Sequence, residues 1–324
     1  MAPLSESRIQ AAAQPKPADY GFDLDRALQA VVGLHALVPE NAFTAEALGT
    51  ERAGNGVLID KGLVLTVGYL VMEAETVWIH RSDGSAVEGH VLGFDYETGF
   101  GLVQALGRLD LPSLRLGVSK DIEIGSRTVT GGAGGRAYSL AGNVIAREPF
   151  AGYWEYAIDE AIFVAPSHPN WGGTALISER GELVGIGSLQ LESAPEDNKV
   201  RPINMMVPID LLKPVLPDLT TYGRPNKPAR PWLGLYATEI DDSVVVAGIA
   251  SRGPAAKAEL KVGDVILAVD GAPVTTLFEL YTRLWALGTA GVDVPLTLKS
   301  RGVTFDVTLK SVDRAKMMRG PKLH

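Results

Sequence analysis

Short apolar runs, rich in β-branched residues and separated by Gly, Asp and Asn, follow one another through the first two-thirds of the chain from Leu24 onward. Examples are NGVLID (55–60), GLVLTV (62–67) and FGLVQAL (100–106). Such runs at such spacing are typical of antiparallel strands, whereas a parallel α/β protein would place helices of about 10 to 15 residues between its strands. We therefore predict an all-β barrel or sandwich for this part.

Composition limits the class of protein. The chain has 324 residues, which is enough for two ordinary domains. With 46% hydrophobic and 21% charged residues it has ample material for buried cores. Its net charge of -8 argues against general nucleic-acid binding, which needs Lys and Arg concentrated on one face.

The chain divides into five segments by composition and pattern. Residues 1–24 mix Ala, Pro, Gln and Ser without periodicity, so we predict a flexible arm there. The β-rich domain spans 25–220, and 221–229 is a linker rich in proline and basic residues. A compact β/α pattern follows at 230–313, and 314–324 is a basic tail.

Targeting signals and cysteines are absent from the sequence. Without cysteine there is no disulfide framework, no thiolate zinc site and no cysteine nucleophile. The first 24 residues lack the apolar core of a signal peptide, and no stretch approaches the about 18 apolar residues of a membrane span. We expect a cytoplasmic protein without membrane insertion, or a periplasmic one if the sequence is a processed form.

Two stretches near the C-terminus carry the strongest motif. RPWLGL (230–235) and GPAAKAELKVGDVILAVDG (253–271) resemble the bacterial HtrA-type PDZ domain. The first lets backbone N–H groups converge on the terminal carboxylate of a peptide, and the glycine keeps the approach open. The following strand would pair with the peptide, and an amphipathic helix from Leu277 would form the other wall. The predicted peptide-binding residues are Trp232, Leu233, Gly234, Leu235, Tyr236, Leu280 and Leu284.

One position departs from the PDZ pattern. Glu259 stands where the family usually has Gly after a short helix, so we expect that helix end to be capped differently. For WLGL alone, an ordinary glycine turn at a strand edge is the alternative.

Three further stretches resemble the HtrA or DegP family of trypsin-like serine proteases over roughly residues 30 to 215. They are NGVLIDKGLVLTVGYLV (55–71), DGSAVEGHVLGFDYETGFGLVQA (83–105) and PSHPNWGGTALISERGELVGIGS (166–188). The resemblance implies a mainly β protein: a trypsin-like double six-stranded antiparallel β-barrel followed by a small α+β PDZ domain.

The same resemblance locates the catalytic positions. Tyr69 falls where the family has its histidine base, Gly99 where it has its aspartate, and Gly172 or, with a one-residue shift, Trp171 where it has its serine. Serine attack needs an imidazole to take the proton and a carboxylate to orient it, and losing triad members costs roughly 10⁴-fold to 10⁶-fold in rate. We therefore predict a pseudoprotease that is not an enzyme.

Other residues are weaker candidates for catalysis or for binding a metal or cofactor. Ser167 and His168 are the alternative catalytic pair, although neighbouring side chains of an extended loop point in opposite directions. His80 and His90 match no metal spacing, and GGAGGRA (131–137) precedes a strand pattern and no helix, so we expect neither metal nor cofactor. The aromatic cluster Tyr153, Trp154 and Tyr156 is predicted to pack between barrel strands, with an exposed aromatic patch as the alternative.

The predicted function follows from the PDZ motif: binding of peptides or protein C-termini, in an adaptor, chaperone-like or regulatory role in protein quality control. Two alternatives stay open. One is an active serine endopeptidase with a rearranged Ser167/His168 site, and the other is a structural, oligomer-forming scaffold. HtrA relatives commonly trimerise through N-terminal aromatic residues, a part that Tyr20 and Phe22 could play in a homotrimer.

Overall fold

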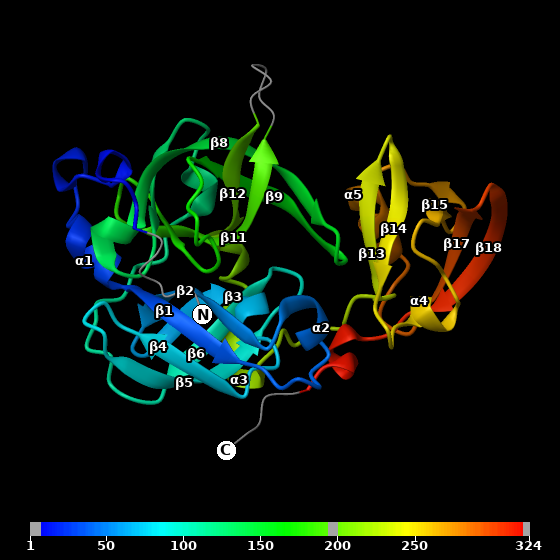
Figure 1. The fold of residues 1–324 in the computed structure, drawn as a ribbon, viewed down its shortest axis with the longest axis horizontal. Coiled ribbons are helices and arrows are strands. Elements are labelled where there is room, and N and C mark those ends of the chain that lie inside the picture. Colours follow the sequence, from blue (N-terminus) through cyan, green and yellow to red (C-terminus); the bar gives the residue numbers. More distant parts are fainter. Residues whose placement is uncertain (1–7, 194–199, 320–324) are drawn as a thin grey trace. The chain divides into compact units, whose positions relative to one another are not determined.

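The computed structural model describes residues 8–193 and 200–319, and they are mainly β (Figure 1). They form two compact units. The first runs up to Glu148 and then from Glu160 to Pro225, and the second combines Pro149–Asp159 with the residues from Asn226 onward.

Two closed barrels of six antiparallel strands make up most of the first unit, which confirms the predicted fold class. The first barrel has the strand order β1-β2-β3-β6-β5-β4. Its strands are β1 (Val31–Leu37), β2 (Glu51–Asp60), β3 (Leu63–Val67), β4 (Thr76–His80), β5 (Ala86–Phe94) and β6 (Phe100–Ala105). The alternation read from the sequence is visible in β5, where buried and more accessible residues alternate towards its end.

The second barrel has the order β10-β11-β12-β9-β8-β7. Its strands are β7 (Arg127–Gly131), β8 (Ser139–Gly152), β9 (Tyr156–Ala165), β10 (Ala175–Ile177), β11 (Leu183–Ser193) and β12 (Arg201–Pro208). Its core includes Ile162, Leu176 and Met206, each with no exposed surface.

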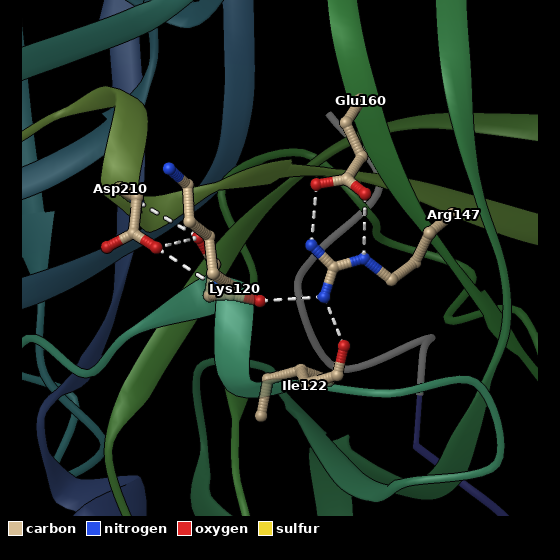
Figure 2. Close-up of polar contacts among 6 residues, drawn as sticks. Lys120, Ile122, Arg147, Glu160 and Asp210 are labelled. Carbon is tan, nitrogen blue, oxygen red and sulfur yellow. Dashed lines mark hydrogen bonds and ion pairs between the residues drawn. The ribbon is translucent and has the colours of Figure 1, made fainter.

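Strands β8 and β9 form a long hairpin whose two ends belong to different units. Near its base Arg147 of β8 pairs with Glu160 of β9 at 2.6 Å, and it also donates to the carbonyl oxygens of residues 119 and 122 (Figure 2). Asp210 holds the same 3-10 turn (Ser119–Asp121) by accepting from the Lys120 N–H at 3.0 Å (Figure 2). The tip, Pro149–Asp159, groups with the second unit.

The predicted flexible arm is folded where the structure describes it; residues 1–7 lie outside the described part. Two 3-10 turns (Ala11–Ala13 and Pro17–Asp19) lead into α1 (Leu24–Gln29), and the Asp23 side chain caps this helix. The Ile9 N–H donates to the Ala137 carbonyl at 2.8 Å. Arg127 donates to the Asp19 carbonyl, and its guanidinium lies 5.4 Å from the Tyr20 ring centre. These contacts fix the arm against the second barrel.

The first unit also contains short helices and further 3-10 turns. They are α2 (Ala45–Leu48), the 3-10 turns Gly68–Leu70, Gly135–Tyr138 and Ile209–Leu211, and α3 (Leu216–Tyr222). The last helix begins after Pro214, so it extends into the segment predicted as a linker. Among the residues described, no helix is long and apolar enough to cross a membrane.

The second unit is a five-strand sheet path, β13-β14-β15-β17-β18, with β16 beside β15 and two helices. Its elements are β13 (Leu235–Ile240), β14 (Ser243–Ile249), α4 (Pro254–Lys257), β15 (Val265–Val269), β16 (Ala272–Pro273), α5 (Leu277–Ala286), β17 (Asp293–Ser300) and β18 (Val303–Lys310). The predicted amphipathic helix is α5, which buries Leu277, Leu280 and Leu284. A 3-10 turn (Arg314–Met317) follows, and residues 320–324 of the basic tail lie outside the described part.

The expectation about Glu259 needs a correction. Glu259 itself takes the left-handed conformation, with φ +58°, that glycine would take after α4. Its N–H donates to the Ala256 carbonyl at 3.2 Å, so the helix ends as it would with glycine and is not capped differently.

Candidate functional site

Tyr69 and Gly172 face each other between the two barrels. Tyr69 lies in the 3-10 turn directly after β3, and its hydroxyl donates to the Ser188 carbonyl at 2.8 Å. A Cβ atom added to Gly172 would lie 2.7 Å from the Tyr69 Oη. The two residues that the sequence aligned with the base and the nucleophile are therefore neighbours in space, as those roles require.

The chemistry of Tyr69 is that of a neutral hydrogen-bond donor. Burial raises its pKa above the ordinary value for tyrosine, so the phenol keeps its proton at neutral pH. The buried Arg52 donates to the carbonyl oxygens of Tyr69 and Met72, each at 2.9 Å, and so holds the turn in place.

The backbone at the other predicted catalytic positions, Gly99 and Trp171, forms hydrogen bonds. The Gly99 carbonyl accepts from the Gly68 N–H at 2.7 Å, beside Tyr69. The Trp171 carbonyl accepts from the Thr174 N–H and hydroxyl. The Gly173 N–H donates to the Gly187 carbonyl at 2.8 Å.

Asn55 is a site residue that the sequence analysis missed. Its Nδ2 donates to the carbonyl oxygens of Asn170 and Gly172 at 2.9 and 3.1 Å, and its Oδ1 accepts from the Ala133 N–H at 2.9 Å. The residue is 2% exposed and joins β2 to the loop containing Gly172. Its place within residues 53–58, which are otherwise small or apolar, was the available signal, because a buried amide needs partners.

Among the described residues, Ser167 and His168, the alternative catalytic pair, are not hydrogen-bonded to each other. The Ser167 hydroxyl accepts from Asn204 Nδ2 at 2.9 Å. The His168 ring lies with Nε2 2.9 Å from the Tyr138 carbonyl, while Nδ1 accepts from the Asn170 N–H at 3.1 Å. Both ring nitrogens are thus engaged, and burial lowers the pKa of His168.

In the second unit, three consecutive backbone N–H groups point at one carboxylate. The N–H groups of Leu233, Gly234 and Leu235 donate to Glu155 at 3.1, 2.7 and 2.9 Å. Gly234 has φ +78°, a left-handed conformation that suits glycine. Trp232, which was predicted to belong to this loop, instead pairs its N–H and carbonyl with Val312.

Glu155 was not recognised in the sequence. It is 7% exposed and lies at the turn of the β8–β9 hairpin. Burial raises its pKa to about 7, while the three donors and Arg314 act in the opposite direction. A single acidic residue between Trp154 and Tyr156 gives no sign from the sequence that a distant loop binds it.

The remaining predicted peptide-binding residues surround this loop. Leu280 and Leu284 of α5 are each 1% exposed and belong to the core of the second unit. The Tyr236 ring centre lies 6.0 Å from that of Tyr153.

The prediction for the aromatic cluster also needs a correction. Trp154 and Tyr156 stack with ring centres 5.5 Å apart, and Tyr153 is 54% exposed. All three lie at the hairpin tip, which groups with the second unit, and not between barrel strands.

Comparison with known proteins agrees with both units. Residues 54–186 match the trypsin-like peptidase domain, and residues 231–310 match the PDZ domain. The serine endoprotease DegS of Salmonella typhimurium is 23% identical over 321 residues, covering 91% of this chain and 86% of DegS. The chain is similar to HtrA-type proteins over both domains.

Further relatives differ in length. The probable periplasmic serine endoprotease DegP-like of Pseudomonas fluorescens is 28% identical over 262 residues, which cover 73% of this chain and 51% of that protein. The chain thus spans about half the length of the DegP-like relatives it matches. A solved HtrA-type protease, AlgW with a tripeptide, shares the fold with a TM-score of 0.53 and 21% identity, covering 95% of this chain and 99% of AlgW.

These names correct one prediction. The HtrA relatives that match over both domains are called serine endoproteases, which contradicts the prediction that the chain is a pseudoprotease and not an enzyme. That prediction depended on residue identities at positions 69, 99 and 172 alone.

Proposed function

We propose that this HtrA-like protein recognises the C-terminal carboxylate of peptides or unfolded proteins in its PDZ domain. The observation that carries the proposal is the convergence of three consecutive N–H groups, from Leu233 to Leu235, on one carboxylate. Charge-assisted hydrogen bonds of this kind are about twice as strong as neutral ones, so the loop is built for a carboxylate.

The surroundings favour an apolar last residue in the ligand. Leu235, Leu280 and Leu284 are at most 2% exposed and belong to one hydrophobic cluster beside the loop. A peptide ending in Leu or Val would place its last side chain next to this cluster and gain about 1.5 to 3 kcal/mol from burying it.

The test compares one peptide in two forms. A labelled decapeptide ending in Leu is titrated as the free acid and as the C-terminal amide. Micromolar affinity, about -8 kcal/mol, is expected for the free acid. Amidation should weaken binding at least about tenfold, because it removes the charge that the N–H groups bind. Equal affinity for the two forms would overturn the proposal.

Peptide-bond hydrolysis is the second candidate function. It is favoured by the names of the relatives, which are called serine endoproteases. Casein turnover should then be measurable and should fall in a Ser167→Ala/His168→Ala variant, which removes the alternative catalytic pair. Absence of turnover in the wild type, or turnover indifferent to this change, would reject hydrolysis at this site.

Oligomerisation belongs to the same proposal, as a homotrimer formed through Tyr20 and Phe22. Their ring centres are 5.5 Å apart, and both side chains are half-buried. Light scattering should give three times the chain mass of 34.4 kDa, and a lower mass for a Tyr20→Ala/Phe22→Ala variant. A wild-type mass of one chain would remove the trimer.

The cellular compartment proposed for this chain is taken from the names of its relatives. DegP and its like are named periplasmic, and we propose the periplasm for this chain in place of the cytoplasm expected from the sequence. Fractionation of the native host with periplasmic and cytoplasmic marker enzymes tests this directly.

A further inference from the structure

The carboxylate loop of the PDZ domain is already filled by a residue of the same chain. Glu155, at the tip of the β8–β9 hairpin, accepts the N–H groups that a terminal carboxylate would need. Its backbone has φ +55°, a left-handed conformation that turns the chain sharply at this point.

The residues around Glu155 also occupy places that a bound peptide would take. The Tyr153 carbonyl accepts from the Ala237 N–H of β13 at 2.9 Å, and β13 is the strand that follows the carboxylate loop. Peptide ligands of PDZ domains add to this strand in the same way. The Trp154 carbonyl accepts from Arg314 at 3.4 Å, and Ala157 joins the hydrophobic core of the unit.

The two carboxylates cannot occupy the loop together. Oε1 of Glu155 receives all three N–H groups, at 3.2, 2.7 and 2.9 Å, and the side chain is almost completely buried. A second carboxylate at this place would lack donors and would meet a like charge in a site shielded from water.

We propose that the hairpin tip, residues 149–159, is an internal competitive ligand that must leave the PDZ groove before an external C-terminus binds. The inference rests on the proposed function, because it concerns the same loop. Its effect is one of population: the apparent dissociation constant equals the intrinsic constant divided by the fraction of molecules whose loop is free. A tethered competitor acts at an effective concentration in the millimolar range, which exceeds the micromolar constants usual for peptides.

The contacts of the hairpin would restrict such a movement to its tip. Arg147 and Glu160 tie the two strands at the base of the tip, with Arg147 also bonded to the Ser119–Asp121 turn (Figure 2). The tip beyond this pair holds the groove through Glu155, two backbone carbonyls and the packing of Ala157 in the hydrophobic core. Releasing it requires these contacts to break, while the Arg147–Glu160 pair lies outside the groove.

The experiment measures the affinity of the free-acid decapeptide ending in Leu for four proteins: wild type, Glu155→Ala, Glu155→Gln and Asp159→Asn. Asp159 is an exposed carboxylate of the same hairpin, so its variant controls for the loss of one negative charge. Glu155→Ala should bind at least about tenfold more tightly than wild type. Glu155→Gln should lie between them, because its amide oxygen still accepts N–H groups, while its NH2 group would face N–H donors. Asp159→Asn should match wild type.

A second readout follows the tip itself. Hydrogen exchange of residues 149–159 should increase when the peptide saturates the wild type, since the buried residues of the tip leave the groove. It should be insensitive to the amidated peptide.

The outcomes separate this inference from the function on which it rests. Equal free-acid affinity for wild type and both Glu155 variants, with the amide still weak, would overturn the internal ligand and leave PDZ recognition standing. No preference for the free acid in any variant would overturn the proposed function. Should Glu155→Ala fail to fold, the nearly isosteric Glu155→Gln decides alone.

Discussion

Oε1 of Glu155 lies 2.7 Å from the backbone nitrogen of Gly234, the shortest of the hydrogen bonds that fill the carboxylate loop of the PDZ domain. The two residues are 79 positions apart in the sequence. This one contact connects a hairpin of the second barrel with the candidate ligand site, and it determines how that site should respond to pH and to mutation.

Peptide binding by the wild type should strengthen as the pH rises from 5 to 8. The pKa of Glu155 is about 7 in the filled loop and near 4.5 when the tip is released. A raised pKa means that the filled state takes up a proton more readily, so filling is favoured below pH 4.5 and loses that advantage as the pH approaches 7. The terminal carboxylate of the peptide stays ionised throughout, and a titration at four pH values measures the trend.

The neighbouring groups do not supply this trend. Burial raises the pKa of Tyr281 further above neutrality. The segment 226–319 contains no histidine. The pH dependence should therefore disappear in Glu155→Gln, and a trend of equal size in that variant would assign it to another group.

Replacing Glu259 by glycine should stabilise the protein by about 1 kcal/mol. Glu259 is exposed and has φ +58°, a conformation that costs a non-glycine residue about this amount. Thermal unfolding of Glu259→Gly measures the gain. Lys257→Gly, inside α4, should lower stability, because glycine there costs helix propensity. No gain at 259 would mean that its conformation carries no strain.

Tyr69→Phe should lower the free energy of unfolding by about 1 to 2 kcal/mol. The change removes the hydroxyl that donates to the Ser188 carbonyl and leaves that oxygen without this donor. Tyr222→Phe is the matched control, since Tyr222 is 60% exposed. Equal stability of the two variants would show that the Tyr69 hydrogen bond is unimportant.

Asn55→Ala should cost about 3 kcal/mol and loosen the loop that carries Gly172. Three hydrogen bonds of its buried side chain disappear at once, to Asn170, Gly172 and Ala133. Urea unfolding compares it with Asn143→Ala, which removes one bond at an exposed position. A cost below that of the control would contradict the role assigned to Asn55.

Local patterns in the sequence were sufficient to predict the architecture. Short strands separated by turn residues indicated an all-β barrel or sandwich, the family resemblance implied two barrels, and the WLGL and GPAAKAEL motifs located the PDZ domain. The neighbouring positions of Tyr69 and Gly172 also followed from the resemblance. These features depend on residues close together in the sequence or on positions fixed by a known fold.

The contacts that determine the site could not be predicted in the same way. Glu155 binds Gly234 and Asn55 binds Gly172 only because folding brings distant segments together. Nothing near Glu155 in the sequence distinguishes it from an exposed turn residue. The prediction that the chain is not an enzyme failed for a different reason. It relied on three residue identities, although the chain as a whole is similar to proteins named serine endoproteases.

The most direct test of carboxylate recognition is to follow the amide NMR signals of Leu233, Gly234 and Leu235 in Glu155→Ala during titration with the free-acid peptide. The account predicts large shifts of these three signals, saturating with the peptide, and none with the amidated peptide. Unchanged signals in the presence of bound free-acid peptide, or equal shifts with the amide, would contradict the claim that this loop binds a C-terminal carboxylate.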